Sequence, residues 1–187
     1  IVMFFILSKN WHMAMDKRLE ELISWSKEVA RMINSQTDFH QRLTSELDRA
    51  KRYNRDLTLA FIKVRDYEGL IKEYGNKNAQ LLFTELIGAL GKELRFCDCI
   101  STFDQDALIL LLPETEAEGA LVSMHRIFDH INEIEFPLRG SDQKTKLELN
   151  AAIVGYKKDE NEDSMIETAK KTAEKAAEEG PGKILEG

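Results

Sequence analysis

The sequence predicts an α/β domain of the mixed (α+β) kind, with helices on both faces of a sheet of four or five strands. Apolar, β-rich runs bounded by polar residues alternate with segments of helical periodicity. Two of these runs are joined by a tight turn, so a hairpin lies between two helical crossovers. The chain has 187 residues and is 43% hydrophobic, enough for one core with an appendage.

The strands are justified by composition and by their boundaries. Leu57–Val64 (LTLAFIKV) is apolar and flanked by polar residues, which favours a buried strand. The pair Asp104-Gln105 forms a turn, and Pro113 closes the run after it. The remaining predicted strands are Cys97–Phe103, Leu108–Leu112 and Leu147–Tyr156.

The helices of the domain are justified by spacing and stop signals. Tyr74-Gly75-Asn76 ends a short helix over Asp66–Glu73. Leucine and isoleucine recur at helical spacing within Ala79–Leu94. Two further helices are predicted, from Glu116 to about Ile134 and over Asn161–Glu179, where alternating charges and alanines indicate a solvated face.

The N-terminal part, residues 1–37, is predicted as a helical extension before a domain of residues 38–187. Residues 11–53 indicate one long helix or two in series, because no glycine or proline interrupts them. Either a short coiled coil or packing on the domain explains the apolar spacing, and packing is preferred after Asn34. The seven-residue series is Trp25, Met32 and Phe39, beside a stripe of Leu19, Leu22, Val29, Ile33 and Leu43. The extension is therefore a candidate surface for a homodimer or a partner protein.

The apolar run Ile1–Leu7 has two interpretations. Spanning a bilayer takes about 20 residues, so the run alone is too short. It is either the cytoplasmic end of a membrane helix, since basic residues follow it, or an apolar helix end that docks on protein.

Charge and cysteine content bear on the partners, the redox setting and the metal sites that can be expected. The net charge of −7 argues against a nucleic-acid partner. Cys97 and Cys99 are too close in sequence for an unstrained bridge, which suits a reducing, cytoplasmic setting. No cysteine or histidine spacing matches a metal site, so neither a metal nor a cofactor is expected.

The order and spacing of these elements resemble the GGDEF domain, the diguanylate cyclase fold that makes cyclic di-GMP from two GTP. The resemblance runs from about Phe39 to Ile184. A basic segment at Arg49–Tyr53 (RAKRY) resembles the segment before the family's first strand. Phe61–Asn76 (FIKVRDYEGLIKEYGN) resembles the strand that carries the family's metal ligand, together with the helix after it. Asp104–Leu108 (DQDAL), followed by LLLPET, occupies the signature turn. The resemblance implies a GGDEF, nucleotide-cyclase-like mixed central sheet and a bacterial signalling role.

The same resemblance implies that catalysis is lost. The family's first metal aspartate falls on Lys63, and its acidic signature pair falls on Asp106 and Ala107. Two metal ions need carboxylates to hold them, and an ammonium group would repel them. The family's glycine, guanine-reading and phosphate positions also fall on unsuitable residues: Asp104, Gln105, Ile71, Lys72, Ala177 and Pro181. We therefore expect a degenerate domain without cyclase activity.

One family motif is kept. Arg95 and Asp98 form an RxxD with five residues between it and Asp104, the spacing of the family's inhibitory cyclic di-GMP site. Arg126, on the following helix, falls where the family often places another arginine of that site. Arginine can fork onto phosphate and stack on guanine, while aspartate accepts from the guanine edge. The alternatives are a cyclic di-GMP receptor, or a ligand-independent scaffold in which Arg95 merely suits a helix C-terminus.

Overall fold

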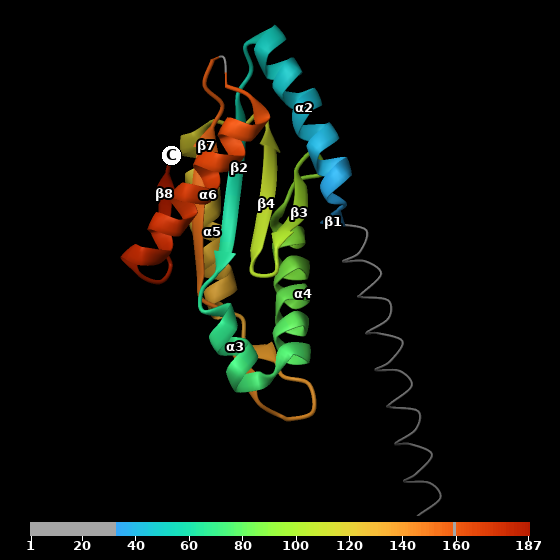
Figure 1. The fold of residues 1–187 in the computed structure, drawn as a ribbon, viewed down its shortest axis with the longest axis vertical. Coiled ribbons are helices and arrows are strands. Elements are labelled where there is room, and N and C mark those ends of the chain that lie inside the picture. The colour runs from blue at the N-terminus through green and yellow to red at the C-terminus, as the bar shows by residue number, and fades with distance from the viewer. Residues whose placement is uncertain (1–32, 159) are drawn as a thin grey trace, which may run out of the picture.

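The computed structural model describes residues 33–158 and 160–187, and its centre is a six-stranded mixed sheet. The strands are β1 (Ile33–Asn34), β2 (Leu57–Val64), β3 (Cys99–Asp104), β4 (Ala107–Pro113), β7 (Leu149–Gly155) and β8 (Ile184–Glu186). Their order is β1-β3-β4-β2-β7-β8 (Figure 1). The four central strands pair antiparallel, whereas β1 and β8 run parallel to their neighbours at the two edges. The predicted mixed sheet with flanking helices is confirmed.

Helices cover both faces of this sheet because side chains alternate along the strands. Leu59 and Phe61 of β2 join a core with α2 (Gln36–Tyr53) and α6 (Glu162–Glu179). Ala60 and Ile62 face the other way, into a core with α4 (Asn76–Glu93) and α5 (Ala117–Glu133). The short α3 (Tyr67–Tyr74) follows β2 and lies beside α4. A small second sheet pairs β5 (Phe136–Pro137) with β6 (Lys144–Thr145).

The structure contains strands that the sequence did not predict. The central sheet has six strands rather than four or five, because β1 and β8 add short edges. A run of two or three residues has no detectable periodicity, so its pairing is decided by the neighbouring strand. The predicted strand Cys97–Phe103 begins two residues later than expected, since residues 95–98 form a turn that precedes β3.

The first described residues test the helix predicted over residues 11–53 and its packing on the domain. A single unbroken helix over residues 11–53 is wrong, because Ile33–Asn34 pair with β3 before α2 begins. Ser35 starts α2 as its N-cap and accepts from the Asp38 amide at 3.1 Å. Phe39 and Leu43 are buried against the sheet, so the preferred packing of this helix on the domain is confirmed.

Residues 1–32 lie outside the described residues. They include the apolar run Ile1–Leu7 and most of the coiled-coil pattern, whose dimer and membrane interpretations therefore stay predictions. Within residues 33–158 and 160–187, no helix is both long enough and apolar enough to cross a membrane.

Candidate functional site

The first candidate site lies where β2 ends beside the β3–β4 turn. Lys63 pairs across the ladder with Ala107, and the Val64 amide donates to the Asp106 carbonyl at 2.8 Å. This register brings the Lys63 Nζ to 3.4 Å from Asp106 Oδ2. Both side chains are partly exposed, at 34% and 26%. The Asp106 carboxylate is thus paired with a cation of the same chain.

A depression of about 440 Å³ surrounds this ion pair. Five of the nine positions that the resemblance assigned to the lost active site line it, and three further lining residues carry charge. The five are Lys63, Ile71, Gln105, Asp106 and Ala177, and the charged ones are Arg65, Asp66 and Glu68. The other four positions, Lys72, Asp104, Ala107 and Pro181, do not line it. Ala107 is buried, while Asp104, Lys72 and Pro181 are exposed.

Tyr67 forms part of the wall of this depression. Burial raises the pKa of its phenol, and the nearby Asp106 carboxylate raises that pKa further. Asp66, in a left-handed conformation at φ 48°, starts α3 and accepts from the Gly69 amide at 3.1 Å. A Cβ at Gly69 would lie 2.2 Å from Asp66 Oδ2, so a larger residue there would displace the capping carboxylate.

The depression provides few ligands for a metal ion. Within the described part of the chain, no three histidine, cysteine or acidic side chains form a group that could hold one. The Asp106 carboxylate, which lines the depression, has an ammonium group as its partner. Divalent magnesium is bound through carboxylates and phosphate oxygens, so the residues present do not fit the family's metal pair.

Asn150 lies on β7, opposite Lys63 of β2, and it fixes the C-terminal end of α6 near this site. Its Nδ2 donates to the Ala176 carbonyl at 3.1 Å and to the Gly180 carbonyl at 2.6 Å. The side chain is fully buried, and its Oδ1 has no hydrogen-bond partner. This anchor places the end of α6, and with it Ala177, against the depression.

The second candidate site is the turn of residues 95–98, between α4 and β3. The Arg95 amide donates to Asp98 Oδ2 at 2.8 Å, and the Asp98 amide donates to the Arg95 carbonyl at 3.0 Å. This reciprocal pair fixes the backbone of the RxxD motif. The Arg95 side chain is exposed, and none of the described acidic residues forms an ion pair with it. Between the two, the Phe96 side chain is fully exposed, at 106%.

Arg126, the third predicted residue, is close to the end of α4 but is not joined to the other two. Its Nη2 lies 3.9 Å from Glu93 Oε2, and the same carboxylate accepts from His130 Nδ1 at 2.8 Å. No hydrogen bond or ion pair joins Arg126 to Arg95 or Asp98 among residues 33–158 and 160–187. Glu93 is the last residue of α4 and lies two residues before Arg95, so its ion pair with Arg126 joins α5 to the end of α4 that leads into the turn.

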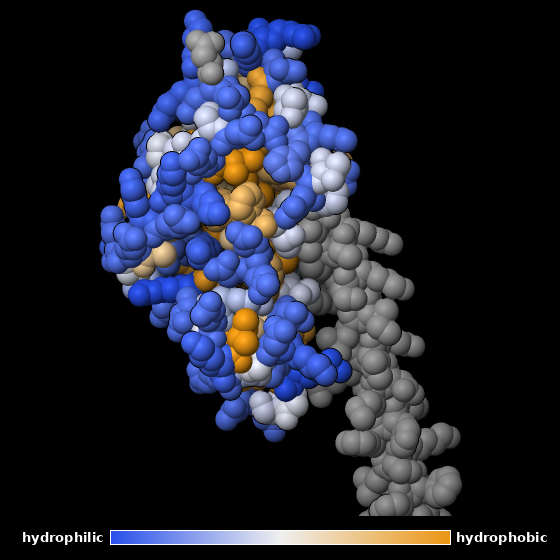
Figure 2. Space-filling model, viewed as in Figure 1, coloured by the Kyte–Doolittle hydropathy of each residue, from blue (hydrophilic) through white to orange (hydrophobic). Residues whose placement is uncertain are grey.

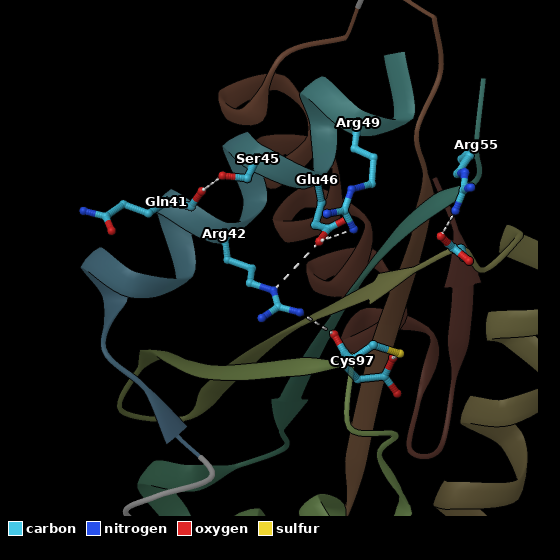
Figure 3. A network of polar contacts seen from close by, with 9 residues as sticks. Gln41, Arg42, Ser45, Glu46, Arg49, Arg55 and Cys97 are labelled. Carbon is cyan, nitrogen blue, oxygen red and sulfur yellow. Dashed lines mark hydrogen bonds and ion pairs between the residues drawn. The ribbon is translucent and has the colours of Figure 1, made fainter. Parts of the chain in front are cut away.

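A contact that the sequence analysis missed connects this turn to α2. Arg42 Nη2 donates to the Cys97 carbonyl at 3.2 Å, inside the RxxD motif (Figure 3). Arg42 Nε also lies 4.0 Å from Glu46 Oε1, and Arg49 Nη1 lies 3.4 Å from the same oxygen. The available signal was the spacing of Arg42 and Glu46, which share a helix face at i and i+4.

A second hollow, of about 510 Å³, lies between α2 and α6. Apolar side chains gather there and hydrophilic ones surround them (Figure 2). Phe39, Phe103, Ile109 and Ile166 supply the apolar lining, and Asp104, Asp163, Glu167 and Lys170 the charged rim. No residue predicted to bind ligand lies in it.

Comparison with known sequences identifies the class to which this fold and its β3–β4 turn belong. The family described as diguanylate cyclase, GGDEF domain, matches residues 30–183, so the chain belongs to the GGDEF family. A curated relative, "Probable diguanylate cyclase DgcC" of Escherichia coli strain K12, is 28% identical over 95 residues. That alignment covers 51% of this chain and 26% of the relative, so the chain spans about a quarter of the relative it matches.

Solved structures share the fold at low sequence identity. The GGDEF domain of FimX from Pseudomonas aeruginosa has a TM-score of 0.76 at 19% identity, covering 82% of this chain and 94% of its own. The GGDEF domain of DgcB from Caulobacter crescentus, in complex with c-di-GMP, has a TM-score of 0.78 at 12% identity and coverages of 82% and 91%. Diguanylate cyclase SiaD with its activator SiaC, from Pseudomonas aeruginosa, has a TM-score of 0.78 at 18% identity and coverages of 97% and 76%.

Proposed function

We propose that this GGDEF domain is a catalytically inactive signalling domain that binds cyclic di-GMP through Arg95, Asp98 and Arg126. The observation that carries the proposal is the geometry of the 95–98 turn. Its backbone is fixed by two hydrogen bonds between Arg95 and Asp98, while the Arg95 guanidinium stays exposed and without an ion pair among the described residues. A preorganised turn with an available cation lowers the ordering cost of binding an anionic ligand.

The chemistry of the turn suits a guanine nucleotide with bridging phosphates. A guanidinium binds phosphate oxygens with two parallel hydrogen bonds and can stack on a base. The Asp98 carboxylate uses Oδ2 for the Arg95 amide, and its remaining lone pairs can accept from the two N–H donors of a guanine edge. Phe96 adds an exposed aromatic ring beside them.

Arg126 would supply the second cation from α5. Its ion pair with Glu93 is long, at 3.9 Å, and the Arg126 side chain is 70% exposed. Such a pair contributes little, so a phosphate can compete for the guanidinium. Glu93 would then keep His130 as its partner.

The residues of the β2–β4 site support the proposed inactivity. Cyclisation of GTP requires metal ions that offset the triphosphate charge and activate a hydroxyl group. Here an ammonium group lies 3.4 Å from the remaining signature acid, and Ala107 supplies no ligand. Ala177, from α6, lines the place where the family's phosphate-contacting cation is expected.

A ligand-independent interaction module is the second candidate function. Phe96, which is fully exposed in the 95–98 turn, would supply aromatic contact area to such an interface. The comparison with SiaD, solved with its activator SiaC, shows that a protein of this fold assembles with another protein.

Calorimetric titration separates the two functions. Cyclic di-GMP is expected to bind the native chain, whereas GTP is not. Arg95→Ala should weaken binding roughly ten- to a hundredfold, from the loss of charged hydrogen bonds of about 1.5–3 kcal/mol each. Arg139→Ala is the matched control, because Arg139 is also exposed but lies in the loop after β5. An absence of heat with the native chain at high micromolar cyclic di-GMP would reject the receptor and favour the interaction module.

A further inference from the structure

We propose that Arg42 is a positioning residue that couples the docking of α2 on the sheet to ligand binding at the 95–98 turn. The inference rests on the proposed cyclic di-GMP site and adds its regulation. It assigns to α2, the first helix of the described chain, a direct part in shaping that site.

The coupling begins with the position of α2 over β3. At the start of the helix, Gln36 Nε2 donates to the Thr102 and Phe103 carbonyls at 3.3 and 3.2 Å. Nearly two turns later, Arg42 donates to the Cys97 carbonyl at 3.2 Å. The helix therefore runs back along β3, from the end of that strand to the turn before it. These contacts bring a side chain of α2 inside the RxxD motif.

Arg42 is itself held in place by a buried acid. Glu46 is 8% exposed, although it carries a carboxylate on a helix surface. A buried carboxylate must be paired, and its partners here are Arg42 at 4.0 Å and Arg49 at 3.4 Å (Figure 3). Arg42 therefore faces Glu46 with Nε, while its Nη2 reaches the Cys97 carbonyl.

The charges around Cys99 support the same arrangement. Burial raises the pKa of the Cys99 thiol, Arg42 lowers it, and Asp98 and Glu46 raise it. Arg42, Glu46 and Asp98 consequently act on one buried side chain at the start of β3. The acid of the proposed ligand site and the cation of α2 belong to one electrostatic cluster.

The contact between Arg42 and the turn links the attachment of α2 to the free energy of ligand binding. The Cys97 carbonyl lies between Arg95 and Asp98, so Arg42 holds the peptide segment that positions both ligand-binding side chains. A ligand that orders this turn strengthens the attachment of α2, and a partner that displaces α2 weakens ligand binding, because linkage between two sites is reciprocal. Helix α2 continues the chain from residues 1–35, so a signal from that side has a physical route to the site.

The test compares Arg42→Gln with Arg49→Gln in the full chain. Both variants remove one positive charge from α2 and one partner of Glu46, but only the first removes the bond to Cys97. Titration with cyclic di-GMP is expected to show roughly fivefold weaker binding by Arg42→Gln and nearly native affinity for Arg49→Gln. If Arg42→Gln does not fold, Arg42→Lys keeps a cation beside Glu46 and is expected to weaken binding to a smaller extent.

Amide hydrogen exchange supplies the readout that a merely structural role would not change. Cyclic di-GMP should slow exchange across α2 in the native chain and in Arg49→Gln, but not in Arg42→Gln. Equal affinities for the two variants, or the same ligand-dependent slowing in both, would overturn the coupling and leave the receptor function standing. Failure of the native chain to bind cyclic di-GMP would overturn the receptor function and the coupling with it.

Discussion

Lys63 on β2 and Asp106 in the β3–β4 turn form an ion pair, with 3.4 Å between Nζ and Oδ2. The pairing follows from the register, in which Lys63 lies opposite Ala107 and the Val64 amide binds the Asp106 carbonyl. The end of β2 and the β3–β4 turn are therefore joined by a charge pair of their own. This relationship leads to the first prediction.

With GTP and Mg²⁺ or Mn²⁺, the chain should form no detectable cyclic di-GMP. Restoring acids by Lys63→Asp with Ala107→Glu should still give no product, because Ile71 and Ala177 continue to line the depression in place of polar groups. Chromatography of the reaction mixture measures this. Product formation by the native chain that is abolished by Asp106→Asn would contradict the assignment.

The second prediction concerns the ionisation of Tyr67. Burial and the Asp106 carboxylate raise the pKa of its phenol above the usual value of about 10. The folded state therefore retains the proton longer than the unfolded state does. Stability from this difference is complete below pH about 10 and is lost as the pH rises toward the folded-state pKa.

Ultraviolet absorbance during a pH titration measures this ionisation. The difference between the native chain and Tyr67→Phe isolates the Tyr67 contribution. Asp106→Asn removes the neighbouring negative charge, so the Tyr67 pKa should fall toward its ordinary value while remaining raised by burial. A Tyr67 pKa at or below the ordinary tyrosine value of about 10 would contradict the structure.

The third prediction concerns the anchor of α6. Asn150→Ala removes both hydrogen bonds to the Ala176 and Gly180 carbonyls, and it should lower the free energy of unfolding by about 1–3 kcal/mol. Urea denaturation measures the loss. Asn132→Ala, at an exposed position of α5, is the matched control and should change stability little. An unchanged midpoint for Asn150→Ala would show that these two bonds contribute nothing net.

The sequence predicted the long elements because their patterns are strong. The apolar run Leu57–Val64 became β2 with its predicted bounds. The β3–β4 hairpin was also predicted, although its turn is Gln105-Asp106, one residue later than the predicted Asp104-Gln105. Short edge strands such as β1 and β8 were missed, because two or three residues show no periodicity and only pairing with β3 or β7 defines them. A pattern can therefore predict an element but not its shortest neighbours.

The site was predictable as a motif but not as a set of contacts. The resemblance to the GGDEF family pointed to Arg95 and Asp98, and the structure joins these two residues through one backbone hydrogen bond and one bond from the Arg95 amide to the Asp98 carboxylate. The Glu93 partner of Arg126 and the contact between Arg42 and Cys97 join residues 33 and 55 positions apart in the sequence. Such contacts depend on how helices pack on the sheet, which local sequence does not encode. The Lys63–Asp106 pair was likewise visible only once the register was known.

The last prediction separates the two tasks of Asp98. Its Oδ2 accepts the Arg95 amide and holds the turn, whereas the charge of the carboxylate is what favours a guanine edge with two N–H donors. Asp98→Asn keeps an oxygen acceptor for the Arg95 amide, so the melting temperature should change little. Affinity for cyclic di-GMP should fall roughly tenfold, because a neutral amide accepts more weakly and offers one oxygen instead of two. Asp98→Ala should lower both affinity and melting temperature, since it also releases the turn. If Asp98→Asn binds as tightly as the native chain, Asp98 serves the turn alone and the guanine-reading role is wrong.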